Sequence, residues 1–157
     1  MLTRAATDPY TDIVARCAIV SGLAEMGMPA VVDSLVAAMV ENGDLEPGHA
    51  GAAATAVLRR EVMTPTAMPG GAAFPHARLT HTPRLRAAIG VSPGGLDLGA
   101  PDGTPTRVVV LVLAPPSENG PYLRFMAALA RCLGRPGAIA NLAGTKDAGI
   151  LRELLLS

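Results

Sequence analysis

The chain has 157 residues, of which 13 are basic and 13 acidic; 50% are hydrophobic and only 3% are aromatic. This length favours one domain that buries most of its apolar surface around a single core of aliphatic side chains. The balanced charge argues against a general polyanion binder, so we expect no nucleic-acid partner.

The sequence pattern indicates a cytoplasmic protein that does not enter a membrane. It has no basic start followed by an apolar block, as a signal peptide would have. Its longest strongly apolar run, VVVLVLA at 108–114, is far shorter than the ~20 residues of a membrane span. Cys17 and Cys132 lie among apolar residues, so we expect buried, reduced thiols, with a disulfide between them as the minor alternative.

The first third of the chain contains two predicted helices. Residues 1–9 have no periodic apolar pattern and are expected to form a loose lead-in. The segment 12–23 is apolar but fits a helix or a strand equally well. Apolar residues recur at helical spacing in 29–43, which predicts an amphipathic helix; they are Val32, Leu35, Val36, Met39 and Val40. An alanine-rich helix is predicted over 48–62.

Strands are predicted after a loop. MTPTAMPGG at 63–71 contains two prolines and two glycines and is expected to be irregular. AAF at 72–74 suits a short strand, and RAAIGVS at 86–92 suits a longer one, followed by turns up to residue 106. RVVVLVLAP at 107–115 is β-branched and apolar on both faces, so it is predicted to be a central strand buried on both sides.

The last part of the chain is predicted to be helical. An amphipathic helix is expected over 121–134, with an inward face made by Leu123, Met126, Ala127, Ala130 and Leu133. Two short helices should follow, broken near Gly144. Helices before, between and after a few strands indicate a layered α/β domain, which we assign to residues 10–157.

His76 is the strongest candidate for a working residue. Pro75 restricts its own φ and pushes Phe74 towards an extended conformation, so the chain is held stiffly just before the imidazole. Gly70 and Gly71 permit an unusual backbone path and close approach of a ligand. A histidine in this setting can act as a general base, a metal ligand or a nucleophile.

Other kinds of site have little support in the sequence. His76 and His81 are five residues apart with no cysteine or further histidine near them, so we expect no metal site. The sequence has no G-x-S-x-G nucleophile motif, no P-loop and no G-x-G-x-x-G, so we expect no cofactor. His81 is expected in an exposed turn and His49 at a helix start, neither with a functional role.

The segment 59–79, RREVMTPTAMPGGAAFPHARL, resembles the active-site stretch of the type-2 enzyme IIA domains of the sugar phosphotransferase system, a group that includes fructose, mannitol and nitrogen-regulatory IIA proteins. The family pattern is an Arg-Glu pair, a loop with Thr or Ser and Gly, and a strand entering Ala-x-Pro-His. The matching residues are Arg60, Glu61, Thr64, Gly70, Gly71, Ala73, Pro75 and His76. The resemblance extends over about residues 15–157 and implies a small mixed β-sheet flanked by helices.

The resemblance implies a role for each matching residue. His76 would accept a phosphoryl group from an HPr-like phosphocarrier, and Arg60 would hold the phosphoryl oxygens with its planar fork of donors. Thr64 and Gly71 would line the phosphoryl-binding site. Tyr122 stands where family members commonly carry a second histidine. A IIB domain or a regulated protein would be a further partner.

Three functions remain open from the sequence. The first is a phosphocarrier or regulatory IIA domain phosphorylated on His76. The second is a non-enzymatic regulatory or interaction module with the IIA fold and weak or lost phosphorylation, which Tyr122 favours because a phenol brings no positive charge. The third is a small hydrolase with His76 as base, for which no nucleophile or metal set is visible.

Overall fold

The computed structural model describes residues 8–157. Its elements are α1 (Pro9–Arg16), β1 (Ala18–Val20), α2 (Met28–Glu41), the 3-10 turn η1 (Pro47–His49), α3 (Ala50–Met63), β2 (Ala72–Ala73), β3 (His76–Arg78), β4 (Arg86–Leu96), β5 (Thr106–Ala114), the 3-10 turn η2 (Pro116–Glu118), α4 (Asn119–Leu133), α5 (Ala138–Ala143) and α6 (Ala148–Leu156). Residues 1–7 of the expected lead-in lie outside the described residues, whereas Pro9 already begins α1.

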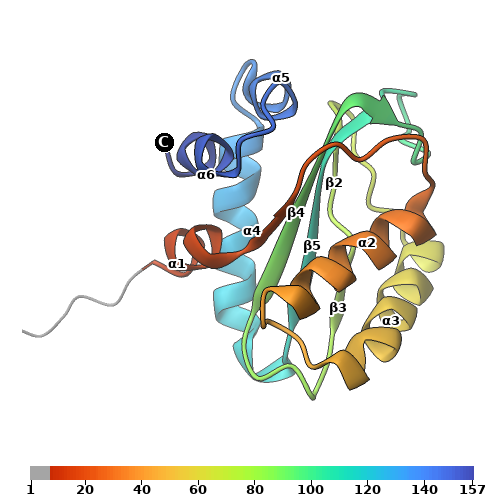
Figure 1. Cartoon of the computed structure of the whole chain (residues 1–157), viewed down its shortest axis with the longest axis vertical. Coiled ribbons are helices and arrows are strands. Elements are labelled where there is room, and N and C mark those ends of the chain that lie inside the picture. Colours follow the sequence, from red (N-terminus) through yellow and green to blue (C-terminus); the bar gives the residue numbers. More distant parts are fainter. Residues whose placement is uncertain (1–7) are drawn as a thin grey trace, which may run out of the picture.

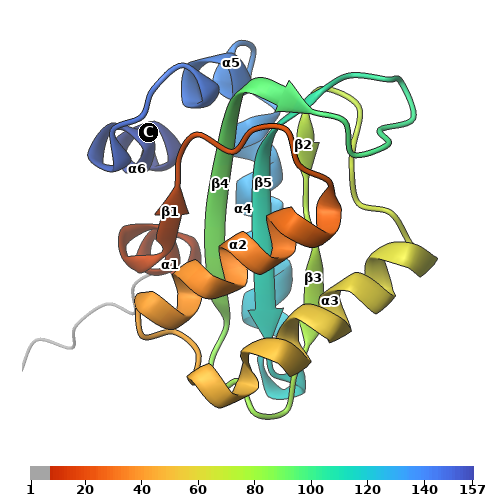
Figure 2. The same ribbon diagram turned by 45° about the vertical axis from the view of Figure 1, so that its right-hand side comes forward.

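The strands form one mixed sheet, which confirms the expected fold class. The order is β1-β4-β5-β2, and β3 also pairs with β5. β4 and β5 are antiparallel, whereas β1, β2 and β3 each run parallel to their neighbour. β2 and β3 follow one another along the same edge of β5, so the chain from 72 to 78 forms a border of the sheet (Figure 2).

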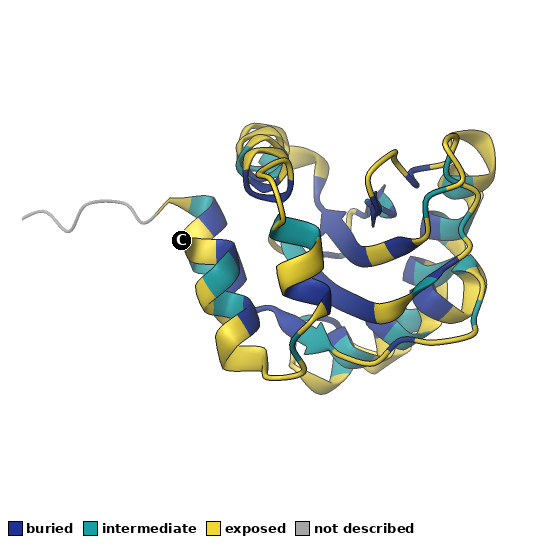
Figure 3. Cartoon of the chain, turned by 90° about the horizontal axis from the view of Figure 1, so that it is seen from above, coloured by how far each residue is buried: buried dark blue, intermediate teal, exposed yellow. Residues whose placement is uncertain are grey.

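Alternate side chains of β5 supply both layers of the core. Val108, Val110 and Val112 face the layer that contains Phe125 of α4, together with residues of α1, α5 and α6. Val109, Leu111 and Leu113 face the layer formed with α2 and α3. Figure 1 shows the sheet between these two groups of helices, and in Figure 3 the buried residues concentrate where sheet and helices face one another. The prediction of a central strand buried on both faces is confirmed.

The ambiguous segment 12–23 divides into the end of α1 and the short strand β1. Cys17 lies between these two elements and is buried, as is Cys132 in α4, and both are free thiols. The prediction of reduced, buried cysteines is therefore confirmed. Tyr10 fixes α1 against the end of the chain, because its hydroxyl donates to the carbonyl of Leu155 at 2.7 Å.

Two predictions for the second half need correction. β4 continues through Pro93, Gly94 and Gly95 to Leu96, where a turn was expected, because a register shift against β5 accommodates the extra residues. The inward face of α4 was only partly predicted, because Leu133 is buried and Met126 packs against the core as expected, whereas Leu123 does not. Leu123 is 57% exposed, whereas Phe125 is fully buried.

Phe125 explains why the buried face of α4 differs from the predicted one. Its ring packs 5.7 Å from the ring of Tyr10, and the residues one and two turns further along, Leu129 and Cys132, are buried with it. Ala127 and Ala130 are exposed instead of buried. Within residues 8–157, none of the helices combines the length and apolar character needed to span a bilayer.

Candidate functional site

His76 begins the edge strand β3. It pairs with Val112 of β5, and Arg78 pairs with Ala114. Val112 and Ala114 both belong to the core layer on the α4 side, and residues i and i+2 of a strand share a face. The side chains of His76 and Arg78 therefore stand on the α4 side of the sheet border, while α3 lies on the other side (Figure 2).

Two hydrogen bonds fix the protonation of the His76 ring. Nδ1 lies 2.8 Å from the carbonyl oxygen of Phe74, which can only accept, so Nδ1 carries the proton. The Nε–H of Arg60 donates to Nε2 at 2.8 Å, so Nε2 presents its lone pair. These contacts favour the tautomer with the proton on Nδ1 and the lone pair on Nε2, where it accepts from the arginine. A nitrogen with its lone pair presented in this way has the chemistry of a nucleophile.

A second network supports the backbone before His76. Thr66 is buried, and its backbone N–H donates to the Glu61 carboxylate at 2.8 Å. Its hydroxyl donates to the other carboxylate oxygen of Glu61 at 2.8 Å and accepts from the N–H of Phe74 at 3.2 Å. The carboxylate next to Arg60 is therefore occupied with Thr66, which ties the end of α3 to the strand that carries His76.

Tyr122 lies on the other side of the imidazole. It is in the first turn of α4, and its ring centroid is 6.0 Å from that of His76. The guanidinium of Arg78 lies over the Tyr122 ring, with Cζ 4.9 Å from the centroid. The Nη2 of Arg78 also donates to the Asn119 side-chain oxygen at 2.5 Å. The residue at the expected second-histidine position is thus close to His76, and it holds an arginine.

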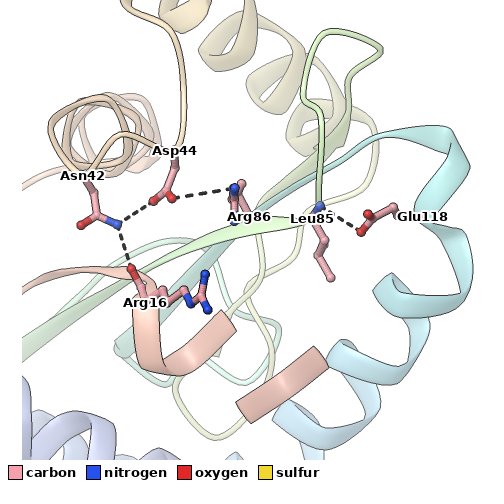
Figure 4. A network of polar contacts seen from close by, with 6 residues as sticks. All are labelled: Arg16, Asn42, Asp44, Leu85, Arg86 and Glu118. Carbon is pink, nitrogen blue, oxygen red and sulfur yellow. Dashed lines mark hydrogen bonds and ion pairs between the residues drawn. The ribbon is translucent and has the colours of Figure 1, made fainter. Parts of the chain in front are cut away.

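A polar contact sets the start of α4 against the loop that follows β3. The Glu118 carboxylate accepts from the Leu85 backbone N–H at 3.1 Å, as Figure 4 shows. In the same region Arg86 forms an ion pair with Asp44 at 3.8 Å. These contacts tie the start of β4 to the residue before α4 and to the loop after α2.

The site carries uncompensated positive charge. Within residues 8–157, the ion pairs closer than 4.0 Å are Arg16–Asp12 and Arg86–Asp44, so neither Arg60 nor Arg78 has a carboxylate partner there. The N-terminus of α4 adds positive potential of the same sign. Two free guanidinium groups beside a nucleophilic imidazole are suited to receive a group that brings negative charge.

His76 is half-buried. A cavity of about 290 Å³ beside α1, with Asp12, Arg84 and Glu118 in its lining, does not include His76. Val62 and Met63, close after Arg60, are each 84% exposed. Exposed apolar side chains therefore lie close in sequence to the arginine that contacts His76.

The structure places Thr64 and Gly71 away from the imidazole contacts. Thr64 ends α3 and is exposed, and its N–H bonds the Arg60 carbonyl. Gly71 accepts from the N–H of Arg107 and of Val108. His76 pairs with Val112, four residues further along β5 than Val108, which corresponds to about 13 Å of strand.

Sequence reasoning missed Thr66, Arg78 and Asn119. Thr66 lies in the same loop as Thr64, and its burial, which identifies it, is not visible in the sequence. Arg78 is two residues after His76 on a strand too short to be recognised from alternation, and its partner Asn119 is 41 residues further on.

His49 and His81 form a pair remote from these contacts. Their ring centroids are 4.2 Å apart, and one nitrogen of each ring is buried without a hydrogen-bond partner. The expectation that His81 is exposed is wrong, since it is half-buried against His49, whereas His49 does stand at the start of α3. Within the part of the chain that the structure describes, no group of three or more His, Cys, Asp and Glu residues could hold a metal ion.

Comparison with known proteins supports the resemblance. The chain is 28% identical over 147 residues to a nitrogen regulatory protein of Bradyrhizobium diazoefficiens, covering 94% of each chain. The crystal structure of the nitrogen regulatory protein IIA-Ntr from Neisseria meningitidis superposes with a TM-score of 0.77 at 18% identity, covering 92% of this chain and 97% of that one.

A complex of enzyme IIA mannitol with phosphorylated enzyme IIB mannitol from Escherichia coli contains a chain of the same fold. The TM-score is 0.72 at 22% identity, with 88% of this chain and 93% of that chain covered. The family model described as the phosphoenolpyruvate-dependent sugar phosphotransferase system, EIIA 2, matches residues 27–157. Because this match spans most of the sequence, the chain belongs to the EIIA 2 family of the phosphoenolpyruvate-dependent sugar phosphotransferase system.

Proposed function

We propose that the protein is a phosphocarrier or regulatory IIA domain that accepts a phosphoryl group on Nε2 of His76 from an HPr-like phosphocarrier. The observation that carries this proposal is the pair of hydrogen bonds on the ring. Phe74 keeps the proton on Nδ1, and Arg60 marks the position next to Nε2 where the phosphoryl oxygens would lie.

The transfer follows from this geometry. The Nε2 lone pair attacks the phosphorus atom of the donor's phosphohistidine while the P–N bond of the donor breaks and its electron pair returns to the donor ring. The proton on Nδ1 stays in its bond to Phe74. Arg60 gives up its bond to Nε2 and donates to the phosphoryl oxygens, whose spread charge needs positioned donors. The resulting phosphoramidate keeps a high transfer potential, so the group can pass on to a second acceptor.

Exposed apolar side chains near the site suit a protein donor. Val62 and Met63 follow Arg60 closely in α3, and Leu123 follows Tyr122 in α4 with 57% of its surface exposed. Apolar residues beside a polar reactive group are typical of transient protein contacts. A protein donor would cover these residues while its phosphohistidine meets His76.

Two fates are possible for the phosphoryl group. It would pass to a IIB domain, or it would stay on His76 and regulate a protein target. The first possibility follows the mannitol IIA–IIB complex that shares the fold, and the second follows the nitrogen regulatory relative. A cytoplasmic location accords with the free thiols of Cys17 and Cys132.

The competing function is a regulatory module that has lost phosphorylation, and Tyr122 is the observation that favours it. A phenol beside His76 cannot take up a proton to balance a dianionic phosphoryl group, as an imidazole can. Such a module would bind its partner through the same surface without taking up phosphate.

Intact-mass measurement separates these two functions. The protein is incubated with phosphoenolpyruvate and the general phosphotransfer proteins, beside His76→Gln and the matched control His81→Gln. We expect wild type and His81→Gln each to gain one acid-labile phosphoryl group and His76→Gln to gain none. Wild type that stays unmodified under conditions that phosphorylate a known IIA domain would favour the regulatory module.

A further inference from the structure

The contacts of Arg78 leave its positive charge without a nearby negative group. Its acceptors are neutral: the amide oxygen of Asn119 and the face of the Tyr122 ring. Within residues 8–157, no carboxylate lies within 4.0 Å of it. It also stands at the N-terminal end of α4, where the helix dipole repels a cation. An arginine held there is stabilised when an anion arrives.

Arg78 lies on the same face of β3 as His76, close to where a phosphoryl group on His76 would stand. Both side chains leave β3 on the same face, with Cα atoms about 6.6 Å apart at ~3.3 Å per residue. Tyr122 bridges them, since its ring lies 6.0 Å from the imidazole and 4.9 Å from the guanidinium carbon. Arg60 approaches the imidazole from α3, on the other side of the sheet.

The contacts of Arg78 leave donors free. A guanidinium has five N–H groups in a planar fork. One nitrogen, Nη2, is engaged with Asn119. Stacking on the Tyr122 ring uses the flat face of the group and leaves the N–H groups at its edge available for a phosphoryl oxygen.

From these observations we propose that Arg78 is the second phosphoryl-binding cation of the site, held in place by the Tyr122 ring and by Asn119. It supplies the charge that Tyr122 cannot. This inference rests on the proposed phosphorylation of His76. Arg60 and Arg78 would then bracket the phosphoryl group, one from α3 and one from β3. Tyr122 acts as a positioning residue through its ring face, and its hydroxyl is not needed.

The first test is the partition of phosphoryl groups between this protein and an HPr-like carrier at equilibrium. Arg78→Gln keeps a donor for Asn119 but loses the charge, and we expect the equilibrium constant for phosphorylation to fall about tenfold, as for one charge-assisted hydrogen bond. Arg78→Lys should recover part of this loss. Arg124→Gln, which removes an exposed cation from the neighbouring helix α4, should change nothing.

Variants of Tyr122 separate the ring from its hydroxyl. Tyr122→Phe keeps the ring under the guanidinium and should partition like wild type, whereas Tyr122→Leu should lose as much as Arg78→Gln. Circular dichroism on each variant checks that the fold is intact. An Arg78→Gln variant that partitions like wild type would overturn the inference while leaving the proposed function standing.

A second measurement does not depend on phosphorylation. His76→Glu places a negative charge at position 76 of β3. The free energy of unfolding in urea is then measured for this variant, for Arg78→Gln and for the double variant, which together form a double-mutant cycle. We expect the two changes to be coupled by about threefold in the unfolding equilibrium constant, as for a surface ion pair. Independent effects would show that Arg78 does not face position 76. If this coupling is found in a protein that is never phosphorylated, the proposed function fails but Arg78 still faces an anion at position 76.

Discussion

At His76, backbone and side-chain contacts together select one reactive nitrogen. The Phe74 carbonyl takes the proton of Nδ1, and the Arg60 guanidinium bonds the lone pair of Nε2. Arg60 is exposed and has no carboxylate partner within residues 8–157, so its main polar contact is Nε2 of His76. Its contribution should therefore appear in transfer and not in stability.

Replacement of Arg60 tests this directly. Removing one preorganised donor from a charge-stabilising site typically slows reaction about 100-fold or more, and we expect that loss for Arg60→Ala. Arg60→Lys should recover only part of the rate because an ammonium lacks the planar fork. Rapid-quench measurement of phosphoryl transfer gives the rate, with Arg59→Ala as the neighbouring control. Equal rates for Arg60→Ala and wild type would show that Arg60 is only a surface charge.

The hydrogen bonds of Thr66 should contribute to the free energy of unfolding. Thr66→Val keeps the shape and the backbone bond to Glu61 but removes the hydroxyl, so the Glu61 carboxylate loses one donor and the half-buried N–H of Phe74 loses its acceptor. We expect about 1–3 kcal/mol less free energy of unfolding in urea. Thr64→Val, two residues away and exposed, should cost almost nothing. Similar losses at both positions would remove the distinction between the two threonines.

Residues in one continuous motif could be predicted, and those in contact across the fold could not. His76 and Arg60 follow from the order Arg-Glu to Pro-His in residues 59–79, and the structure brings both together. The Arg78–Asn119 bond depends on how α4 docks against β3, which no local pattern encodes. Thr66 was missed because burial distinguishes it from Thr64, and burial is set by tertiary packing.

At the scale of elements, the long periodic segments were predictable and their exact faces were not. The helices over 29–43 and 48–62 correspond to α2 and α3, and β5 is the expected central strand. The face of α4 was misjudged because alanines permit several burial patterns, and Phe125 decides among them by packing on Tyr10. The extension of β4 depends on a register shift against β5, which is a property of the pair of strands.

Gly71 belongs to this scale because it shapes the entry into β2. Its φ is +103°, and a Cβ there would lie 3.2 Å from the Pro105 carbonyl oxygen. Gly71→Ala should therefore lower the free energy of unfolding by about 1–3 kcal/mol through backbone strain. Thermal or urea denaturation measures the loss, with Gly51→Ala in α3 as control, where a Cβ meets nothing within 4 Å.

The same variant bears on the predicted binding role of Gly71. If the glycine acts only through the backbone, phosphoryl transfer by folded Gly71→Ala at low temperature should stay near the wild-type rate. A variant of normal stability with strongly reduced transfer would instead support a direct role in phosphoryl binding.

For the whole molecule, the two-layer core around β5 controls access to both thiols. Cys17 and Cys132 belong to the same core layer, and each is about 95% or more buried. Burial raises the pKa of the Cys17 thiol from its ordinary value of 9.0 to about 11, with Arg152 opposing the rise and Asp44 adding to it. The thiolate is therefore favoured in the unfolded chain more than in the folded one.

This difference gives a pH prediction. Since the folded pKa is raised, the contribution of Cys17 to stability is fully present below pH 9 and is lost as the pH rises from about 9 to 11. Urea unfolding of wild type and Cys17→Ala at pH 8, 9.5 and 10.5 measures it. The stability advantage of wild type over the variant should shrink with rising pH. A difference that is constant across this range would contradict the account.

The most direct test of the central claim is the identity of the nitrogen that carries the phosphoryl group. Two-dimensional ¹H–¹⁵N NMR of the ¹⁵N-histidine-labelled protein, recorded before and after phosphorylation by an HPr-like carrier, distinguishes Nδ1 from Nε2 of each ring. We predict that the free protein shows His76 as the Nδ1–H tautomer and that phosphorylation shifts its Nε2 resonance most strongly, while Nδ1 keeps its proton. A phosphoryl group on Nδ1 of His76, or on His49 or His81, would contradict the assignment.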